Sequence, residues 1–227
     1  MGTLVAAVSS PSTIADAAGA VALLVLLSEF AMLRAAFSRS QVRLYAFQSL
    51  SVSALAVIVA ATRHIGELYV LAGLSLVLKV FIVPSIILRL LREVRGDLAG
   101  SHRLGVASMV LLAIVLSVFG IFVVGTMPIH SKTLPTLALA VAAAVVLVAF
   151  LLVIVRSDVV SQAVGFFSLE NGVSLASLVL AAGLPLIAEV AFLFDLLVAV
   201  VVFGVLMRVH HDRTSTLSTR ALERLRG

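Results

Sequence analysis

Residues 134–155 read LPTLALAVAAAVVLVAFLLVIV, twenty-two residues without a charged side chain. At a rise of about 1.5 Å per residue, a helix of this length matches the roughly 30 Å hydrocarbon core of a bilayer. Hydrocarbon offers no hydrogen-bond partner to the backbone, so a long apolar run forms a helix, whereas a transmembrane barrel shows short alternating segments. The stretch therefore predicts a transmembrane α-helix.

Six other runs of the same kind occupy most of the chain. The 227 residues are 62% hydrophobic and only 12% charged, and their mean hydropathy of +1.25 lies outside the range of a soluble domain. The sequence predicts an all-α, polytopic integral membrane protein with seven transmembrane helices. They are expected at residues 17–37, 42–62, 66–91, 104–126, 134–155, 159–182 and 185–208.

Basic residues indicate the orientation. If the connections are assigned alternately to the two sides, thirteen arginines fall on one side, against Arg63 and Lys132 on the other. Cytoplasmic loops carry the excess of Lys and Arg, so we expect an outside N-terminus and a cytoplasmic C-terminus, in the inner (cytoplasmic) membrane of the cell. The net charge of +5 then reflects topology and gives no reason to expect nucleic-acid binding. The thirteen are Arg34, Arg39, Arg43, Arg89, Arg92, Arg95, Arg103, Arg156, Arg208, Arg213, Arg220, Arg224 and Arg226.

Cysteine and histidine usage argues against a cofactor in this chain. There are no cysteines, which excludes disulfides, thiolate metal sites and iron–sulfur ligation. The five histidines fall at predicted helix ends or in loops, so a haem held by paired helix histidines is not expected. We therefore predict no metal site, no redox cofactor and no catalytic residue. The histidines are His64, His102, His130, His210 and His211.

Five ionisable side chains fall within the predicted helices. A charge near the bilayer centre is costly, so by default it faces the protein interior or a hydrated cavity and marks an ion or proton pathway. A carboxyl group there can also hold a proton and stay neutral, which makes it a candidate proton carrier. The five are Glu29, Lys79, Glu170, Glu189 and Asp195.

Position along the helices separates the acids. Glu170 is the twelfth residue of helix 159–182 and Asp195 the eleventh of helix 185–208, so both are expected near the midplane. Glu189 lies about 9 Å further toward the outside and is turned about 120° from Asp195 around the axis. Glu29 lies near the cytoplasmic end of its helix, where snorkelling beside Arg34 is the favoured interpretation and an accessory relay role the alternative.

Lys79 is expected at the centre of helix 66–91, where an ammonium needs a carboxylate, water or loss of its proton. Pro84 removes the hydrogen bond to the carbonyl of Val80, and a freed carbonyl beside Lys79 is a natural place for water. The alternative is a structural ion pair with Glu170 or Asp195, whose titrations would be strongly coupled.

Other polar and small residues suggest anchoring and packing. His64 and Glu67, beside Arg63 in a turn, are possible accessory residues for proton uptake, although an interfacial anchor is favoured. Gln48 and three serines in helix 42–62 could line a hydrated interface, but the favoured interpretation is that they form hydrogen bonds between helices. The serines are Ser49, Ser51 and Ser53, and the glycines expected to permit close helix packing are Gly165, Gly172, Gly183 and Gly204.

Several stretches carry a family resemblance. They are GFFSLENGVSL at 165–175, PLIAE at 185–189, FDLLVAV at 194–200, RLYAFQSL at 43–50 and LKVFIVP at 78–84. Together they resemble component E of hydrogenase 4 over most of the chain. The last three helices are also similar to the K-type subunit of respiratory complex I and to its counterpart in multisubunit sodium/proton antiporters.

The order of helices and loops divides the chain into a four-helix region at 1–127, a three-helix unit at 128–208 and a basic cytoplasmic tail at 209–227. The resemblance implies that the three-helix unit is K-subunit-like and suggests a set of relay residues. Glu170 takes the place of the first buried acid of the K-type subunit. Asp195 fits the second better than Glu189 by its distance from Arg208, but the choice between the two stays open.

The function that the resemblance implies is that of a membrane-arm subunit in a hydrogenase-like or complex I-like assembly. Its partners would be antiporter-like and quinone-subunit-like membrane subunits and a hydrogenase-like peripheral arm, which would carry out the redox chemistry. This chain would relay protons, or sodium ions, through its buried charges. The alternatives are a stand-alone ion-coupled transporter and a purely structural subunit.

Overall fold

The computed structural model describes residues 11–93, 104–128, 135–180 and 204, and within them the chain is all-helical. The predicted helix 185–208, with Glu189 and Asp195, lies outside the described residues except for Gly204. The elements are α2 (Pro11–Arg34), α3 (Ser38–Arg63), α4 (Gly66–Ser75), the π-helix η1 (Leu76–Ile82), α5 (Val83–Glu93), α6 (Val106–Thr126), α7 (Thr136–Val155) and α8 (Val159–Leu180).

Six helical segments in the described part of the chain are long and apolar enough to cross a membrane, as the sequence predicted for these residues. One of them, Gly66–Arg89, combines most of the continuous rod formed by α4, η1 and α5. The chain is therefore a polytopic membrane protein. The largest boundary error is at the start of the first helix, because α2 begins at Pro11, six residues before the predicted start at 17. At its other end α2 stops at Arg34, although Ala35, Ala36 and Phe37 are apolar.

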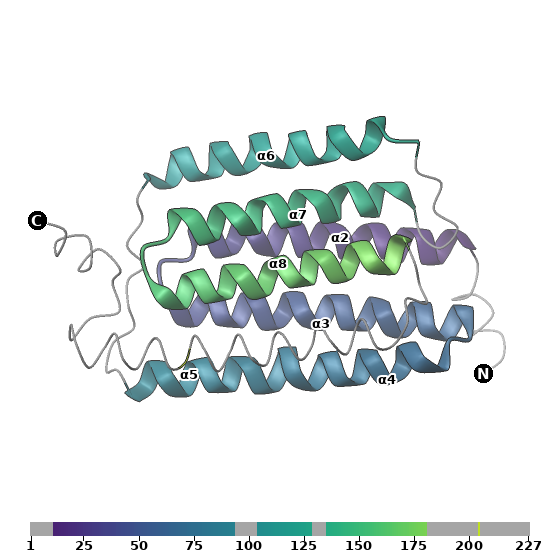
Figure 1. Cartoon of the computed structure of the whole chain (residues 1–227), viewed down its shortest axis with the longest axis horizontal. Helices are drawn as coiled ribbons and strands as arrows, with labels where there is room; N and C mark the ends of the chain where they lie inside the picture. Colours follow the sequence, from purple (N-terminus) through teal and green to yellow (C-terminus); the bar gives the residue numbers. More distant parts are fainter. Residues whose placement is uncertain (1–10, 94–103, 129–134, 181–203, 205–227) are drawn as a thin grey trace, which may run out of the picture.

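The helices run antiparallel to their chain neighbours and form a layered bundle (Figure 1). The helix α7 packs against α6, α2 and α8, and α3 packs against α2, α8 and the α4–η1–α5 rod. The α3–α4 turn marks one end of the bundle, called here the α3–α4 end. The α2–α3 and α7–α8 turns lie at the other, called here the α2–α3 end.

The bundle exposes large apolar side chains on its surface and buries polar ones within its apolar core. Leu111, Val118 and Phe122 of α6 are largely exposed, whereas Gln48 and Asn171 are fully buried. In lipid, apolar surfaces gain little by leaving the solvent, so association between helices depends on close packing and hydrogen bonds. The bundle therefore keeps its polar groups in the interior.

Glycines set the distance between α7 and α8, as the sequence predicted. A Cβ on Gly165 would lie 2.9 Å from Val153 Cγ2 and 3.1 Å from the Val153 backbone nitrogen. A Cβ on Gly172 would lie 2.9 Å from Val146 Cγ2 and 3.3 Å from the Val146 nitrogen. The two backbones thus approach too closely for larger residues. The packing roles of Gly183 and Gly204 stay predictions.

We expect Gly172→Ala to destabilise the bundle by about 1–3 kcal/mol, because the added methyl must push α7 and α8 apart. Gly125→Ala is the matched control, since nothing lies within 4 Å of a Cβ at that helical position. Thermal unfolding of the two variants in detergent compares them. Equal unfolding temperatures would mean that the α7–α8 approach is not tight.

Arg156 is one of the arginines that the sequence assigned to the cytoplasmic side. Its side chain is fully buried in the α7–α8 turn. Its Nη2 donates hydrogen bonds toward the carbonyl oxygens of Met32, Leu33 and Ala35, at 3.1, 2.8 and 2.7 Å. The last carbonyls of a helix lack partners within it, so this guanidinium caps α2.

The same contact explains why α2 ends before the apolar residues that follow it. Burial lowers the pKa of Arg156, and the charge of Asp158, two residues further on, raises it. The guanidinium nevertheless keeps its proton, as arginine does throughout proteins. A fixed charge from one turn therefore joins α2 to α7.

We expect Arg156→Met to destabilise the protein by about 1–3 kcal/mol for each carbonyl left buried and unpaired. Arg89→Met, at an exposed arginine of α5, serves as the control. The comparison uses thermal unfolding in detergent. A loss of stability that is the same in both variants would contradict the capping role.

Candidate functional site

Lys79 and Glu170 form a buried ion pair between η1 and α8. Lys79 Nζ lies 2.9 Å from Glu170 Oε1, and the two side chains are only 3% and 15% exposed. Lys79 Nζ also lies 3.4 Å from both Asn171 Oδ1 and Ser174 Oγ. The structure thus pairs Lys79 with Glu170, one of the two acids that the sequence offered, while Asp195 lies outside the described residues.

The π-helix η1 holds Lys79 in this position. At its end the N–H of Val83 donates to the carbonyl of Leu78, five residues earlier instead of four. Pro84 follows at once, and its ring and missing N–H disfavour a regular α-turn there. The sequence indicated a break at Pro84, and the structure resolves it as a widened turn, which is frequent at functional sites. Within η1, Lys79 is buried whereas Val77 and Phe81 are exposed.

A chain of hydrogen-bonded side chains leads from the ion pair to Glu29. Asn171, which accepts from Lys79, donates through Nδ2 to Gln48 Oε1 at 2.9 Å. Gln48 donates through Nε2 to Glu29 Oε1 at 3.0 Å. Every bond in this chain runs in the same direction, from the ammonium to the carboxylate. Two amides thus connect a cation on η1 with an acid on α2.

Two serines support this chain from the side. Asn171 Nδ2 also donates to Ser49 Oγ at 2.8 Å. Ser168 Oγ contacts Glu29 Oε1 and lies 2.7 Å from Gln48 Oε1. A hydroxyl has one proton, so Ser168 donates to one of these oxygens at a time. The interpretation of Gln48 and Ser49 as hydrogen bonds between helices is confirmed. Within the described part of the chain, Ser51 bonds instead within α3, to the carbonyl of Phe47.

The favoured interpretation of Glu29, an interfacial carboxylate beside Arg34, is wrong. Glu29 is fully buried among Gln48 and Ser168, whereas Arg34 is exposed. Distance from the end of a helix predicts depth in the membrane but not the face on which a side chain lies. The face could have been found only by matching Glu29 to partners on other helices.

A cavity adjoins the ion pair. It has a volume of about 60 Å³ and lies between α3, the α4–η1 segment and α8. Hydroxyl groups from all three line it beside Lys79 and Glu170, and Ser53 Oγ lies 3.5 Å from Ser75 Oγ. Valine, leucine and alanine side chains make up the rest of the lining, so water in this cavity binds at its hydroxyl, ammonium and carboxylate groups. The serines are Ser53, Ser75, Ser174 and Ser177.

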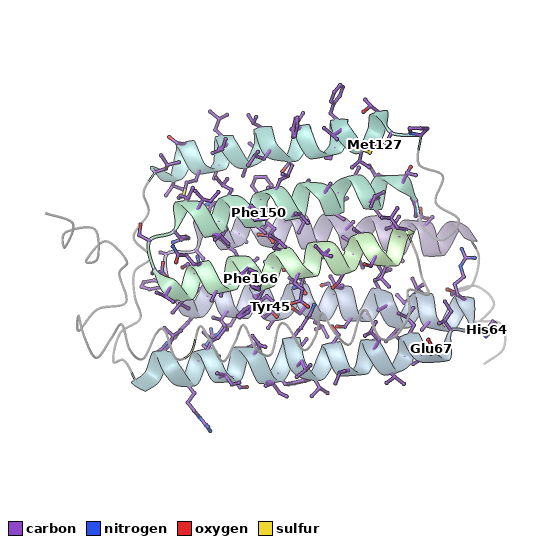
Figure 2. All side chains as sticks on the ribbon, viewed as in Figure 1. Tyr45, His64, Glu67, Met127, Phe150 and Phe166 are labelled. Carbon is purple, nitrogen blue, oxygen red and sulfur yellow. The ribbon has the colours of Figure 1, made fainter. Side chains whose placement is uncertain are left out.

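His64 and Glu67 are not part of this arrangement. Both are exposed at the α3–α4 end, as Figure 2 shows. His64 ends α3 in a left-handed conformation with φ of 54°, and its N–H donates to the carbonyl of Ala60. Glu67 lies in the first turn of α4, where a negative charge suits the helix dipole. Both residues thus lie at the α3–α4 turn. Their possible accessory role in proton uptake stays a prediction.

The chemistry of the site is that of coupled charges. Within residues 11–93, 104–128 and 135–180 no group of three or more His, Cys, Asp or Glu side chains could hold a metal ion. Lys79 and Glu170 can gain or lose protons, and each charge stabilises the other. Amides do not take up protons, so Gln48 and Asn171 connect Glu29 to the pair through their orientation and dipoles.

We expect Lys79→Met and Glu170→Gln each to destabilise the protein by up to about 3–5 kcal/mol, because each leaves a buried partner charge uncompensated. The double variant should recover much of this loss, since it removes both charges. Thermal unfolding of the four proteins completes the cycle. If the two single losses simply add in the double variant, Lys79 and Glu170 do not interact energetically.

Known proteins were compared with the whole chain. No family model and no solved structure matches it. Hydrogenase-4 component E of Escherichia coli is 27% identical over 183 residues, which span 81% of this chain and 85% of that protein, and the Shigella flexneri protein of the same name matches equally. A 69-residue stretch is 46% identical to an uncharacterized protein of Mycobacterium tuberculosis, of which it spans only 31%. The chain is thus a distant homologue of hydrogenase-4 component E over most of its length.

Proposed function

We propose that this chain is a membrane-arm subunit of a group 4 nickel–iron hydrogenase-like or complex I-like assembly, in which Lys79 and Glu170 relay protons. The observation that carries the proposal is the ion pair between them, held near the middle of two membrane-spanning helices beside a hydroxyl-lined cavity. The homology to a protein named as a component of hydrogenase 4 supports the setting.

The relay uses the mutual dependence of the two charges. When Glu170 takes up a proton, Lys79 loses its counter-ion in a medium of low dielectric constant, which favours release of a proton from the ammonium. The pair returns to its charged form when the proton on Glu170 passes to the neutral Lys79, so each cycle takes up one proton at Glu170 and releases one from Lys79. A change of charge in a neighbouring subunit can therefore move one proton through the pair.

The proposed topology has seven transmembrane helices, with an outside N-terminus and a cytoplasmic C-terminus in the inner membrane. The distribution of arginines supports it, and it places the α3–α4 end on the outside. Residues 1–127 form the first region, 128–208 a K-subunit-like unit and 209–227 a cytoplasmic tail. The relay continues through Asp195 or Glu189 on helix 185–208, and protons are favoured over sodium ions because an ammonium occupies the site.

The proposed partners are antiporter-like and quinone-subunit-like membrane subunits and a hydrogenase-like peripheral arm. The lack of cysteines in the chain supports a division of labour in which other subunits hold the redox centres. A purely structural subunit is the second candidate, because the direct 2.9 Å ion pair and its hydrogen bonds also suit a fixed support. A stand-alone transporter is the third.

We expect Glu170→Gln, Lys79→Met and the double variant to lose proton translocation while electron transfer continues. The assembly is purified through a tag on this chain, reconstituted in vesicles, and assayed for protons moved per electron transferred. The double variant is decisive, since it lacks the uncompensated charge that destabilises the single variants. Asp16→Asn, at an exposed acid of α2, is the control and should pump normally.

Wild-type pumping by the double variant in an intact assembly would contradict the relay and favour the structural role. Recovery of the chain only as a homo-oligomer that transports ions by itself would favour the transporter. Co-purification with a nickel–iron or complex I-like large subunit supports the proposed setting.

A further inference from the structure

The cavity beside the ion pair lies in one half of the bundle. The helix α3 lines it with residues between Val52 and Ala56, and α8 with residues from Glu170 to Leu178. Both helices run toward the α3–α4 end. The helix α4 starts at that end and runs in the opposite direction, and its residues between Leu71 and Ser75 line the cavity. The cavity therefore extends from Lys79 and Glu170 toward the α3–α4 end.

The contents of this cavity follow from its lining. A buried water molecule needs at least about 10–15 Å³ of such space and two to four polar partners. The cavity offers about 60 Å³, an ammonium, a carboxylate and hydroxyl groups at several depths. Ser75 lies about 6 Å from Lys79 along the helix axis, and Ser177 about 10 Å from Glu170. Waters placed between them can pass a proton from group to group.

On the other side of the pair, the described neighbours are buried, and the pocket along η1 and α5 from Phe81 to Arg89 does not include Lys79 or Glu170. Toward the α2–α3 end come Glu29 and Gln48, which bond directly to one another and are fully buried. Beyond them Tyr45 and Phe167 pack with ring centroids 5.9 Å apart, and both are also fully buried. Figure 2 shows Tyr45 away from the end that carries His64 and Glu67.

We infer that the Lys79–Glu170 pair exchanges protons with water from the α3–α4 end alone, through the serine-lined cavity, as far as the described residues determine the path. This access path deepens the proposed function and rests on it. The buried neighbours on the other side separate the pair from the α2–α3 end, where Glu29 is connected to it by amides and not by water. The site thus has an open side and a sealed side, which a directional relay requires.

Accessibility to silver ions tests this inference, because the chain has no native cysteine. Silver ions are small, do not cross lipid and react with thiolates. Ser75→Cys and Ser177→Cys place thiols in the cavity, and Ser168→Cys places one on the sealed side. Glu67→Cys and Ser40→Cys, at exposed positions of the two ends, identify the side from which silver acts. The full-length variants are reconstituted in oriented vesicles, and unreacted thiol is measured afterwards with maleimide in denaturant.

We expect Ser75→Cys and Ser177→Cys to react with silver added on the side that modifies Glu67→Cys, and to stay unreacted from the side that modifies Ser40→Cys. Ser168→Cys should react at least about tenfold more slowly from either side, since silver does not reach a buried thiol without a water path and such a site disfavours the reactive thiolate. Equal reaction from both sides, reaction from the opposite side, or rates no higher than that of Ser168→Cys would overturn the inference.

The result is independent of the pumping assay. If silver reaches the cavity from one side but the double variant at Lys79 and Glu170 pumps normally, the relay fails and the access path stands. If the double variant stops pumping but silver does not reach Ser75→Cys or Ser177→Cys, the access path fails and the relay stands.

Discussion

The contact between Lys79 and Glu170 is the interaction on which the interior of this bundle depends. An ammonium in the middle of a membrane must find a counter-charge or lose its proton. Glu170 supplies that charge, but only because η1 turns Lys79 inward and Gly172, two residues after Glu170, lets α8 lie tightly on α7. The buried ammonium of Lys79, which is costly to place in a membrane, thus lies where the packing between helices is tightly constrained.

The six helices described could be read from hydropathy, since each apolar run must satisfy its own backbone in lipid. The positions of Lys79 and Glu170 near the middle of their helices followed from the same counting. The direction that each side chain faces did not, because an apolar helix has no polar face to reveal its orientation. Glu29 was misassigned for that reason, and the burial of Arg156 was not predicted, because the sequence does not show that a residue in a turn is enclosed by other helices.

Homology and geometry contribute different parts of the functional argument. The distant homology is to a protein named as a component of hydrogenase 4, and 27% identity says little about any one residue. The geometry identifies the side chains that can respond to charge. Asn171 and Ser168 illustrate the difference, because neither is charged and both join the acid of α2 to the ion pair.

The orientation of the two amides has a mechanical consequence. Gln48 presents its carbonyl oxygen to Asn171 and its NH₂ group to Glu29, while Asn171 presents its carbonyl oxygen to Lys79. Turning either amide alone sets two NH₂ groups or two oxygens against each other, so the pair can only reverse together. Such a reversal suits a neutral Lys79 that accepts a hydrogen bond and a protonated Glu29 that donates one. The two amides therefore have two matched orientations. Through them the charge of Lys79 on η1 is coupled to Glu29 on α2 without any proton passing between the two residues.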